Sequence, residues 1–272
     1  MSQEVNYKHD KEKQKVWFPY SVSAEPDDFI VQNGVHGHCP DVVCDETCHQ
    51  HNPRYWQNLK ISDVINNTPE IGCFGCSFTY GSFLPESETW PNLLQQSLQR
   101  QTGNFGVPGG GADACLTNLV NAHHHFGINT AIVLFPVMDR RLLKFKKKNL
   151  FFQLPIGPHS EWPHDEFASQ NYFNGEFMHE MIAETKNQIT LDVAQKYSKE
   201  KILQIQNFCR EKNIKLYTSS WDSQTMNFLR DHNFCVLPAF DMTVTNERAG
   251  DLRHPCKVHN ANWVSMIEAS IM

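Results

Sequence analysis

The 272-residue sequence predicts an α/β fold in which a doubly wound parallel sheet lies between two layers of helices. Two patterns support this prediction. From about residue 70 onward, short apolar segments alternate with longer helical ones, as in strand–helix–strand units with right-handed crossovers. In addition, the segment Ala131 to Pro136 is apolar almost throughout, which is typical of a strand buried on both faces of a parallel sheet.

The strands are predicted where short apolar runs are bounded by polar residues or glycine. In chain order they cover Ile71 to Gly75, Asn104 to Val107, Ala131 to Pro136, Lys215 to Ser219 and Phe234 to Leu237. The carboxyl ends of parallel strands meet at one edge of a sheet, so functional groups are expected in the segments that follow them.

The helices are predicted where apolar residues recur at helical spacing. They cover Thr89 to Gln101, Ala114 to Phe126, Ile189 to Lys212, Ser223 to Asp231 and Asn260 to Ser270. In the first of them, Trp90, Leu94 and Leu98 fall on one face, and Pro91 stands near the start, where proline is favoured.

One domain is expected over residues 70–272, preceded by an extension, residues 1–69, that packs on it. Residues 140–187 interrupt the alternation of strands and helices with a lysine run and a stretch rich in proline, histidine and tryptophan. We therefore expect these residues to form a long insertion of irregular structure.

Composition and charge argue against several classes of protein. The 30 acidic residues outnumber the 24 lysines and arginines, and one short basic run spans residues 144–148, so no nucleic-acid-binding surface is expected. No apolar run approaches the roughly 18 residues of a membrane span, and the first residues lack the apolar core of a secretory signal. The nine cysteines are then expected to be reduced thiols in a cytoplasmic protein.

Three segments at the predicted strand ends hold residues suited to hydrolysis. Ser77 follows the first strand between small residues, where a sharp turn would expose its hydroxyl and leave backbone N–H groups free to bind an oxyanion. The glycines after the second strand would let the backbone approach a substrate closely. After the last strand, Asp251 and His254 have the spacing at which a carboxylate can orient an imidazole. Such a base is needed because a serine hydroxyl is a poor nucleophile at neutral pH.

The segments FGCSFTYG, NFGVPGG and DLRHP resemble three sequence blocks of the SGNH (GDSL-type) hydrolases, a flavodoxin-like α/β family of serine esterases and lipases. The resemblance implies that Ser77 is the nucleophile, that His254 is the general base and that Asp251 orients it. It also implies two oxyanion donors, the backbone N–H groups of Ser77 and Gly109. The implied reaction is hydrolysis of a small acyl, acetylated-sugar or lipid ester through an acyl-enzyme, with no metal or organic cofactor.

Two positions depart from the family's pattern. Cys76 stands where the family has an Asp before the nucleophile, and that Asp is not a reacting group. Met138 stands where the third block has an oxyanion-binding Asn, although the following Asp139 is retained. Loss of one such donor can lower the rate on the order of 10²–10³-fold. One hypothesis is that Arg140 supplies a replacement donor. The alternative to an active esterase is a weakly active or inactive binding or structural protein on the same scaffold.

Two groups of cysteines suggest other functions. Cys73 and Cys76 form a C-x-x-C pair, which we interpret as buried cysteines because redox pairs usually open a helix and Cys73 falls inside a predicted strand. The extension holds a group of possible zinc ligands: Cys39, Cys44, Cys48 and His49. Two interpretations of these residues stay open. They could form a structural zinc site, which would make this a zinc-dependent protein, or they could be free thiols in an irregular segment.

Overall fold

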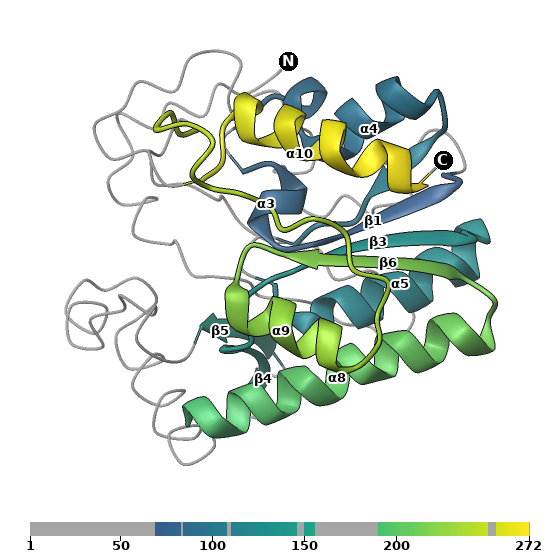
Figure 1. Cartoon of the computed structure of the whole chain (residues 1–272). Helices are drawn as coiled ribbons and strands as arrows, with labels where there is room; N and C mark the ends of the chain where they lie inside the picture. Colours follow the sequence, from purple (N-terminus) through teal and green to yellow (C-terminus); the bar gives the residue numbers. More distant parts are fainter. Residues whose placement is uncertain are drawn as a thin grey trace, which may run out of the picture.

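The computed structural model describes residues 69–82, 84–107, 110–145, 150–155, 190–249 and 254–271 (Figure 1). The predicted extension and most of the predicted insertion lie outside these residues. So do Gly109 and Asp251, two of the predicted site residues, and the four possible zinc ligands.

Four parallel strands form the main sheet, in the order β2-β1-β3-β6. They are β1 (Ile71–Gly75), β2 (Thr102–Asn104), β3 (Thr130–Phe135) and β6 (Lys215–Ser220). A single parallel bridge between Thr218 and Val236 continues the sheet beyond β6. This order is that of flavodoxin-like doubly wound sheets, in which ligands bind beyond the carboxyl ends of the strands.

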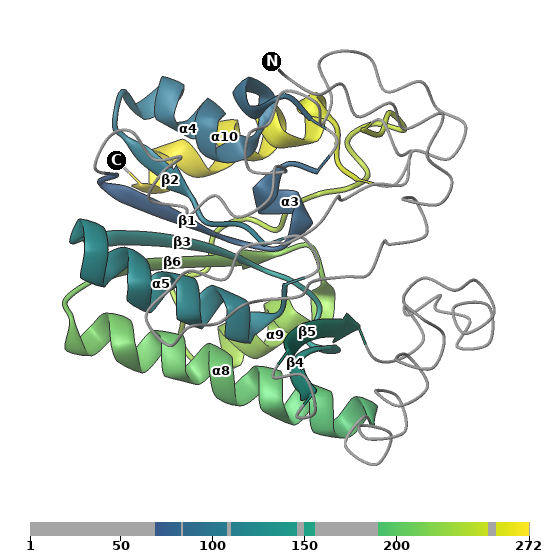
Figure 2. The same cartoon turned by 180° about the vertical axis from the view of Figure 1, so that it is seen from behind.

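Helices cover both faces of this sheet (Figures 1 and 2). On one face lie α4 (Trp90–Leu98) and α10 (Lys257–Ile271), which pack against each other. On the other face lie α5 (Ala112–Phe126), α8 (Leu191–Glu211) and α9 (Ser223–Asp231). The fold class predicted from the sequence, a three-layer doubly wound α/β sheet, is therefore confirmed. No helix among the described residues is long and apolar enough to cross a lipid bilayer.

Strand β3 shows why its sequence is apolar throughout. Successive side chains of a strand point to opposite faces. Ile132 and Leu134 pack with the two buried tryptophans Trp90 and Trp263 on the α4–α10 side, and Val133 packs under α5 and α8. Because helices cover both faces, a polar residue on either side of β3 would be buried without water, and the prediction of a doubly buried strand is confirmed.

The structure corrects the expectation that residues 140–187 are irregular throughout. Strands β4 (Arg140–Phe145) and β5 (Leu150–Pro155) pair antiparallel as a separate two-stranded sheet. The apolar residues of these two runs flank the lysine run, so the runs can pair with each other locally. The lysines and the later prolines are typical of an irregular loop, and they obscure this pairing in the sequence.

Two predicted strands also differ from the observed ones. The second strand begins earlier, as β2 (Thr102–Asn104), and its residues carry little apolar pattern because it lies at the sheet edge. The predicted residues after Asn104 nevertheless stay beside β1, since the Val107 N–H donates to the Gly75 carbonyl at 2.9 Å. The last predicted strand, Phe234 to Leu237, is reduced to the bridge at Val236.

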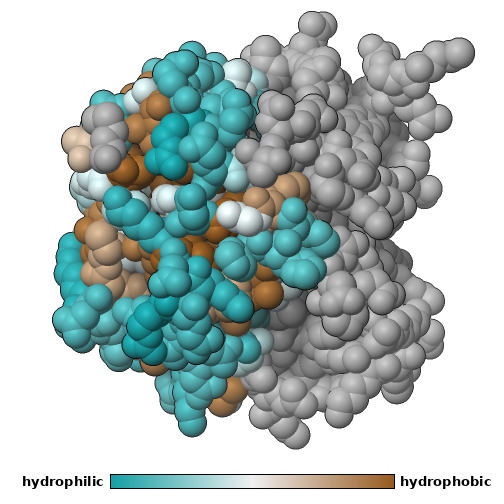
Figure 3. Space-filling view, turned by 90° about the vertical axis from the view of Figure 1, so that its right-hand side faces the viewer, coloured by the Kyte–Doolittle hydropathy of each residue, from teal (hydrophilic) through white to brown (hydrophobic). Residues whose placement is uncertain are grey.

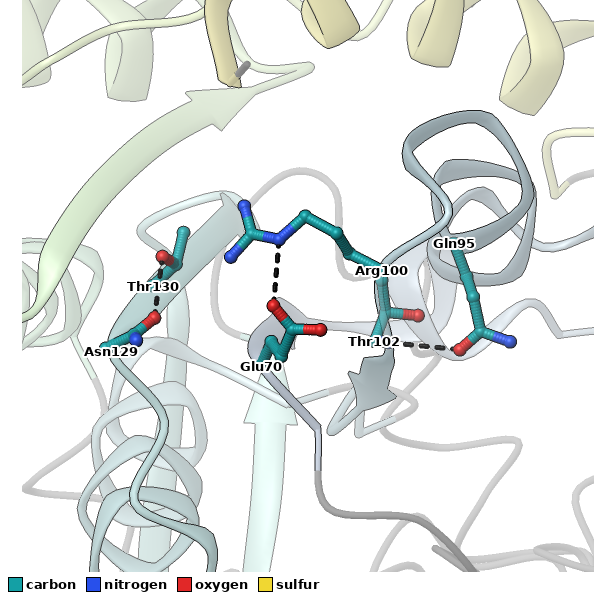
Figure 4. A network of polar contacts seen from close by, with 6 residues as sticks. All are labelled: Glu70, Gln95, Arg100, Thr102, Asn129 and Thr130. Atoms are coloured by element: carbon teal, nitrogen blue, oxygen red, sulfur yellow. Dashed lines mark hydrogen bonds and ion pairs between the residues drawn. The ribbon is translucent and has the colours of Figure 1, made fainter.

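The end of the sheet at which the strands begin carries a polar network (Figure 4). Arg100 Nε lies 3.0 Å from Glu70 Oε2, and the Thr102 N–H donates to Gln95 Oε1 at 3.0 Å. Much of the described surface on this side is hydrophilic, with apolar residues between (Figure 3). Because the Arg100–Glu70 pair is solvent-exposed, it contributes less than about 1 kcal/mol to stability. Ser77 and His254, the predicted catalytic residues that the structure describes, lie at the opposite end of the strands.

Candidate active site

Ser77 lies at the carboxyl end of β1, as the first residue of the short helix α3 (Ser77–Tyr80). The turn into this helix requires glycine at position 75, where an added Cβ would lie 2.7 Å from the Leu134 carbonyl oxygen. The Ser77 side chain is largely buried, and its hydroxyl lies within weak hydrogen-bonding distance, 4.0 Å, of Cys76 Sγ. The first N–H groups of a helix have no carbonyl partner within that helix, so this turn directs backbone donors toward the strand end.

The segment after β2 packs tightly against α3. Asn104 Nδ2 donates to the Thr79 carbonyl at 2.9 Å, and Asn104 Oδ1 accepts from the Gly106 N–H at 3.1 Å. An added Cβ at Gly106 would lie 2.3 Å from the Tyr80 nitrogen, so the close approach requires glycine. The glycine-bearing segment that follows β2, which begins at Asn104, therefore lies directly beside the helix that carries Ser77.

His254 reaches the same end of the sheet from the far end of the chain. Its ring meets the ring of Phe78, the residue after Ser77, edge-on at a centroid distance of 6.0 Å. Phe78 also stacks on Trp221 at 5.0 Å and contacts Phe240 at 5.8 Å. The structure thus brings the His254 ring next to the helix that begins with Ser77. Phe78, Trp221 and Phe240 form an aromatic cluster beside it.

The third segment follows β3 and holds Met138, Asp139 and Arg140. Met138 is 3% exposed and packs in the core on the α5 side. Asp139 is buried as well. Arg140 Nη1 donates to the Gly110 carbonyl at 3.3 Å, which places its guanidinium beside the second glycine-bearing segment.

The charge of Arg140 also reaches the start of α5. Burial raises the pKa of the Cys115 thiol well above its ordinary value, and the nearby Arg140 charge opposes this rise. The Arg140 guanidinium therefore lies close to Gly110 and to the start of α5, at the carboxyl end of the sheet.

The described cysteines near the site are free thiols. Cys73 is fully buried on the α4–α10 side of the sheet, and this burial raises the pKa of its thiol well above the ordinary value. Its interpretation as a buried core cysteine is confirmed. Within the described ranges, no group of three or more His, Cys, Asp or Glu side chains is arranged to bind a metal. The zinc site of the extension stays a prediction.

Trp221 and Arg248, near His254, were not singled out from the sequence. Trp221 directly follows β6, and an aromatic residue at the carboxyl end of a strand is a signal that could mark it. Arg248 has no periodic pattern that would mark it. Arg248 and His259, which follows the DLRHP segment, both contact the segment that leads to His254.

No family model matches the sequence, and no curated protein matches it. Several solved structures do match. A member of the lipolytic protein G-D-S-L family from Veillonella parvula is 14% identical, with a TM-score of 0.32, over 72% of this chain and 94% of its own. TesA is 9% identical, with a TM-score of 0.44, over 74% and 97%.

An acetyl xylan esterase from Butyrivibrio proteoclasticus is 8% identical, with a TM-score of 0.41, over 75% of this chain and 63% of its own. The fold and the serine at the first strand end define a doubly wound α/β protein with a candidate hydrolase site.

Proposed function

We propose that this chain is a serine esterase that hydrolyses a carboxylic ester through an acyl-enzyme. The contact between the His254 ring and Phe78 is the observation that carries this proposal, because it brings an imidazole from the C-terminal part of the chain against the residue that follows Ser77. An imidazole beside a serine at a strand end is the arrangement that activates a hydroxyl for attack on a carbonyl carbon.

The proposed reaction has two steps. His254 takes the proton from Ser77 Oγ, which attacks the ester carbonyl carbon, and the oxyanion accepts hydrogen bonds from the backbone N–H groups of Ser77 and Gly109. The tetrahedral intermediate expels the alcohol, which receives the proton from His254. In the second step His254 takes a proton from water, the resulting hydroxide attacks the acyl carbon, and Ser77 leaves with the proton. Asp251 orients the imidazole and stabilises its charged form in both steps.

A fluorophosphonate probe, which phosphonylates activated serines, tests this proposal. Wild-type protein is expected to be labelled and to hydrolyse at least one of a series of p-nitrophenyl esters of increasing chain length. Ser77→Ala is expected to lose both properties.

The matched control is Ser82→Ala, because Ser82 is equally buried, follows the same helix and has no hydrogen-bond partner for its hydroxyl in the described part of the chain. It should keep both properties. A folded wild type that is neither labelled nor active would contradict the proposal. That result would favour the alternative of an inactive binding protein, for which the buried Met138 is the supporting observation.

Arg140 is proposed to replace the missing amide donor of the third block. Replacing Arg140 with alanine is expected to lower kcat on the order of 10²–10³-fold, the usual effect of losing one oxyanion donor, with a much smaller change in KM. Arg140→Lys should retain part of the rate because it keeps the charge. Steady-state kinetics on the best p-nitrophenyl ester would measure both effects.

Arg100→Ala is the control for this variant, since the Arg100 guanidinium also has a polar partner, Glu70, but lies at the opposite end of the sheet (Figure 4). Its rate should match that of the wild type. An Arg140→Ala enzyme that turns over at the wild-type rate would remove Arg140 from the oxyanion site.

A further inference from the structure

The segment that leads to His254 is organised around one side chain, Arg248. Arg248 Nη1 donates to the carbonyl oxygens of Thr245 and Glu247, both at 2.7 Å. Its Nη2 donates to the Met242 carbonyl at 3.1 Å. One guanidinium group thus binds three carbonyl oxygens of the chain that precedes it. The fixed fork of arginine donors suits such a role better than a lysine ammonium group does.

His259, in the first turn of α10, binds the same segment from the other side. Its ring is 1% exposed, and the Cys256 N–H points at its Nδ1 at 3.2 Å. Because a backbone N–H can only donate, Nδ1 must be the acceptor, and we assign the ring proton to Nε2. This Nε2–H faces the Met242 carbonyl at 3.3 Å. His259 and Arg248 therefore donate to the same carbonyl oxygen.

Arg248 and His259 also contact each other, because Arg248 Nη1 lies 3.3 Å from His259 Nε2. The two side chains therefore form one structure that joins this loop to the start of α10.

This structure continues on both sides of His254. The Ala249 N–H donates to the His254 carbonyl at 2.9 Å, and Arg248 pairs with Pro255 in an antiparallel bridge. After Pro255, Cys256 is bound by His259. The His254 carbonyl and the backbone that follows it are thereby held relative to α10, while the His254 ring lies against Phe78.

We propose that Arg248, assisted by His259, is a positioning residue that holds the His254 imidazole facing Ser77. This inference rests on the proposed esterase function. The physical reason is that a general base acts over hydrogen-bond distance, and a misplacement of about 1 Å can lower the rate on the order of 10²-fold. Arg248 does not contact the reacting atoms; it acts through the backbone that carries His254.

Arg248→Met and Arg248→Lys test this role, with Arg230→Met on α9 as the matched control for loss of an exposed arginine. Titration with the fluorophosphonate probe first counts the active sites in each preparation, so that kcat refers to folded, competent enzyme. Arg248→Met is expected to lower kcat per titrated site by about 10- to 100-fold, with KM changed less than about 2-fold. Arg248→Lys should recover part of this loss, and Arg230→Met should match the wild type.

Three outcomes would overturn the inference. If Arg248→Met reduces the number of titratable sites or the Tm but leaves kcat per site unchanged, Arg248 is only a structural residue. If Arg248→Met equals the wild type in every measurement, Arg248 has neither a positioning nor a structural role. A wild type that the probe never labels would overturn the proposed function and this inference with it, so the two failures are distinguishable.

Discussion

Replacing Ser77 with alanine, His254 with alanine, or both together is expected to lower kcat/KM to the same residual value. Each single variant should lose on the order of 10⁴-fold, because a nucleophile without its base, or a base without its nucleophile, leaves only the oxyanion donors and substrate binding to act. The double variant should be no slower than either single variant, since the second change removes a group that can no longer function. Hydrolysis of the best p-nitrophenyl ester by the three variants measures this non-additivity.

Two controls accompany these variants. Ser82→Ala replaces a buried serine of the same region, and His232→Ala replaces an exposed histidine that bonds the Phe228 carbonyl at the end of α9. Both should retain the wild-type rate. If the losses of Ser77→Ala and His254→Ala were small, or multiplied in the double variant, the two residues would not act as a unit and the proposed mechanism would be wrong.

The second large effect is expected on stability, from Trp263→Ala. The Trp263 ring is fully buried on α10, packs edge-on against Trp90 at 4.9 Å and contacts Phe240 at 5.5 Å. Its Nε1–H also donates to the Pro238 carbonyl at 2.9 Å. Truncation to alanine removes these contacts and leaves a cavity, so the free energy of unfolding should fall by about 3–5 kcal/mol. Urea denaturation followed by circular dichroism would measure the change.

A loss of this size is a large fraction of the ~5–15 kcal/mol stability of a typical domain. Trp263→Phe, which keeps most of the ring volume but not the hydrogen-bond donor, should cost distinctly less. Met266→Ala, at an exposed position of the same helix, should stay within about 0.5 kcal/mol of the wild type. An equal effect of the Trp263 and Met266 changes would show that α10 does not contribute to the core as the structure indicates.

The order of strands and helices could be predicted because each element carries its own periodic pattern. The helix Ser223–Asp231 was predicted with the observed bounds, and β3 was recognised from its apolar run alone. The edge strand β2 was predicted with shifted bounds, since an edge strand needs few apolar residues. The hairpin of β4 and β5 was not predicted, since a hairpin depends on pairing with one neighbour. These elements are defined by their partners more than by their own residues.

The candidate site divides in the same way. The sequence by itself determined the fold class, the strand ends and the residue types that stand there, because alternation and spacing are local properties of the chain. Only the tertiary structure decided that the His254 ring meets Phe78, that Met138 points into the core and that Arg248 and His259 share the Met242 carbonyl. Those contacts join segments with no periodic pattern, and their geometry follows from how the crossover helices pack on the sheet.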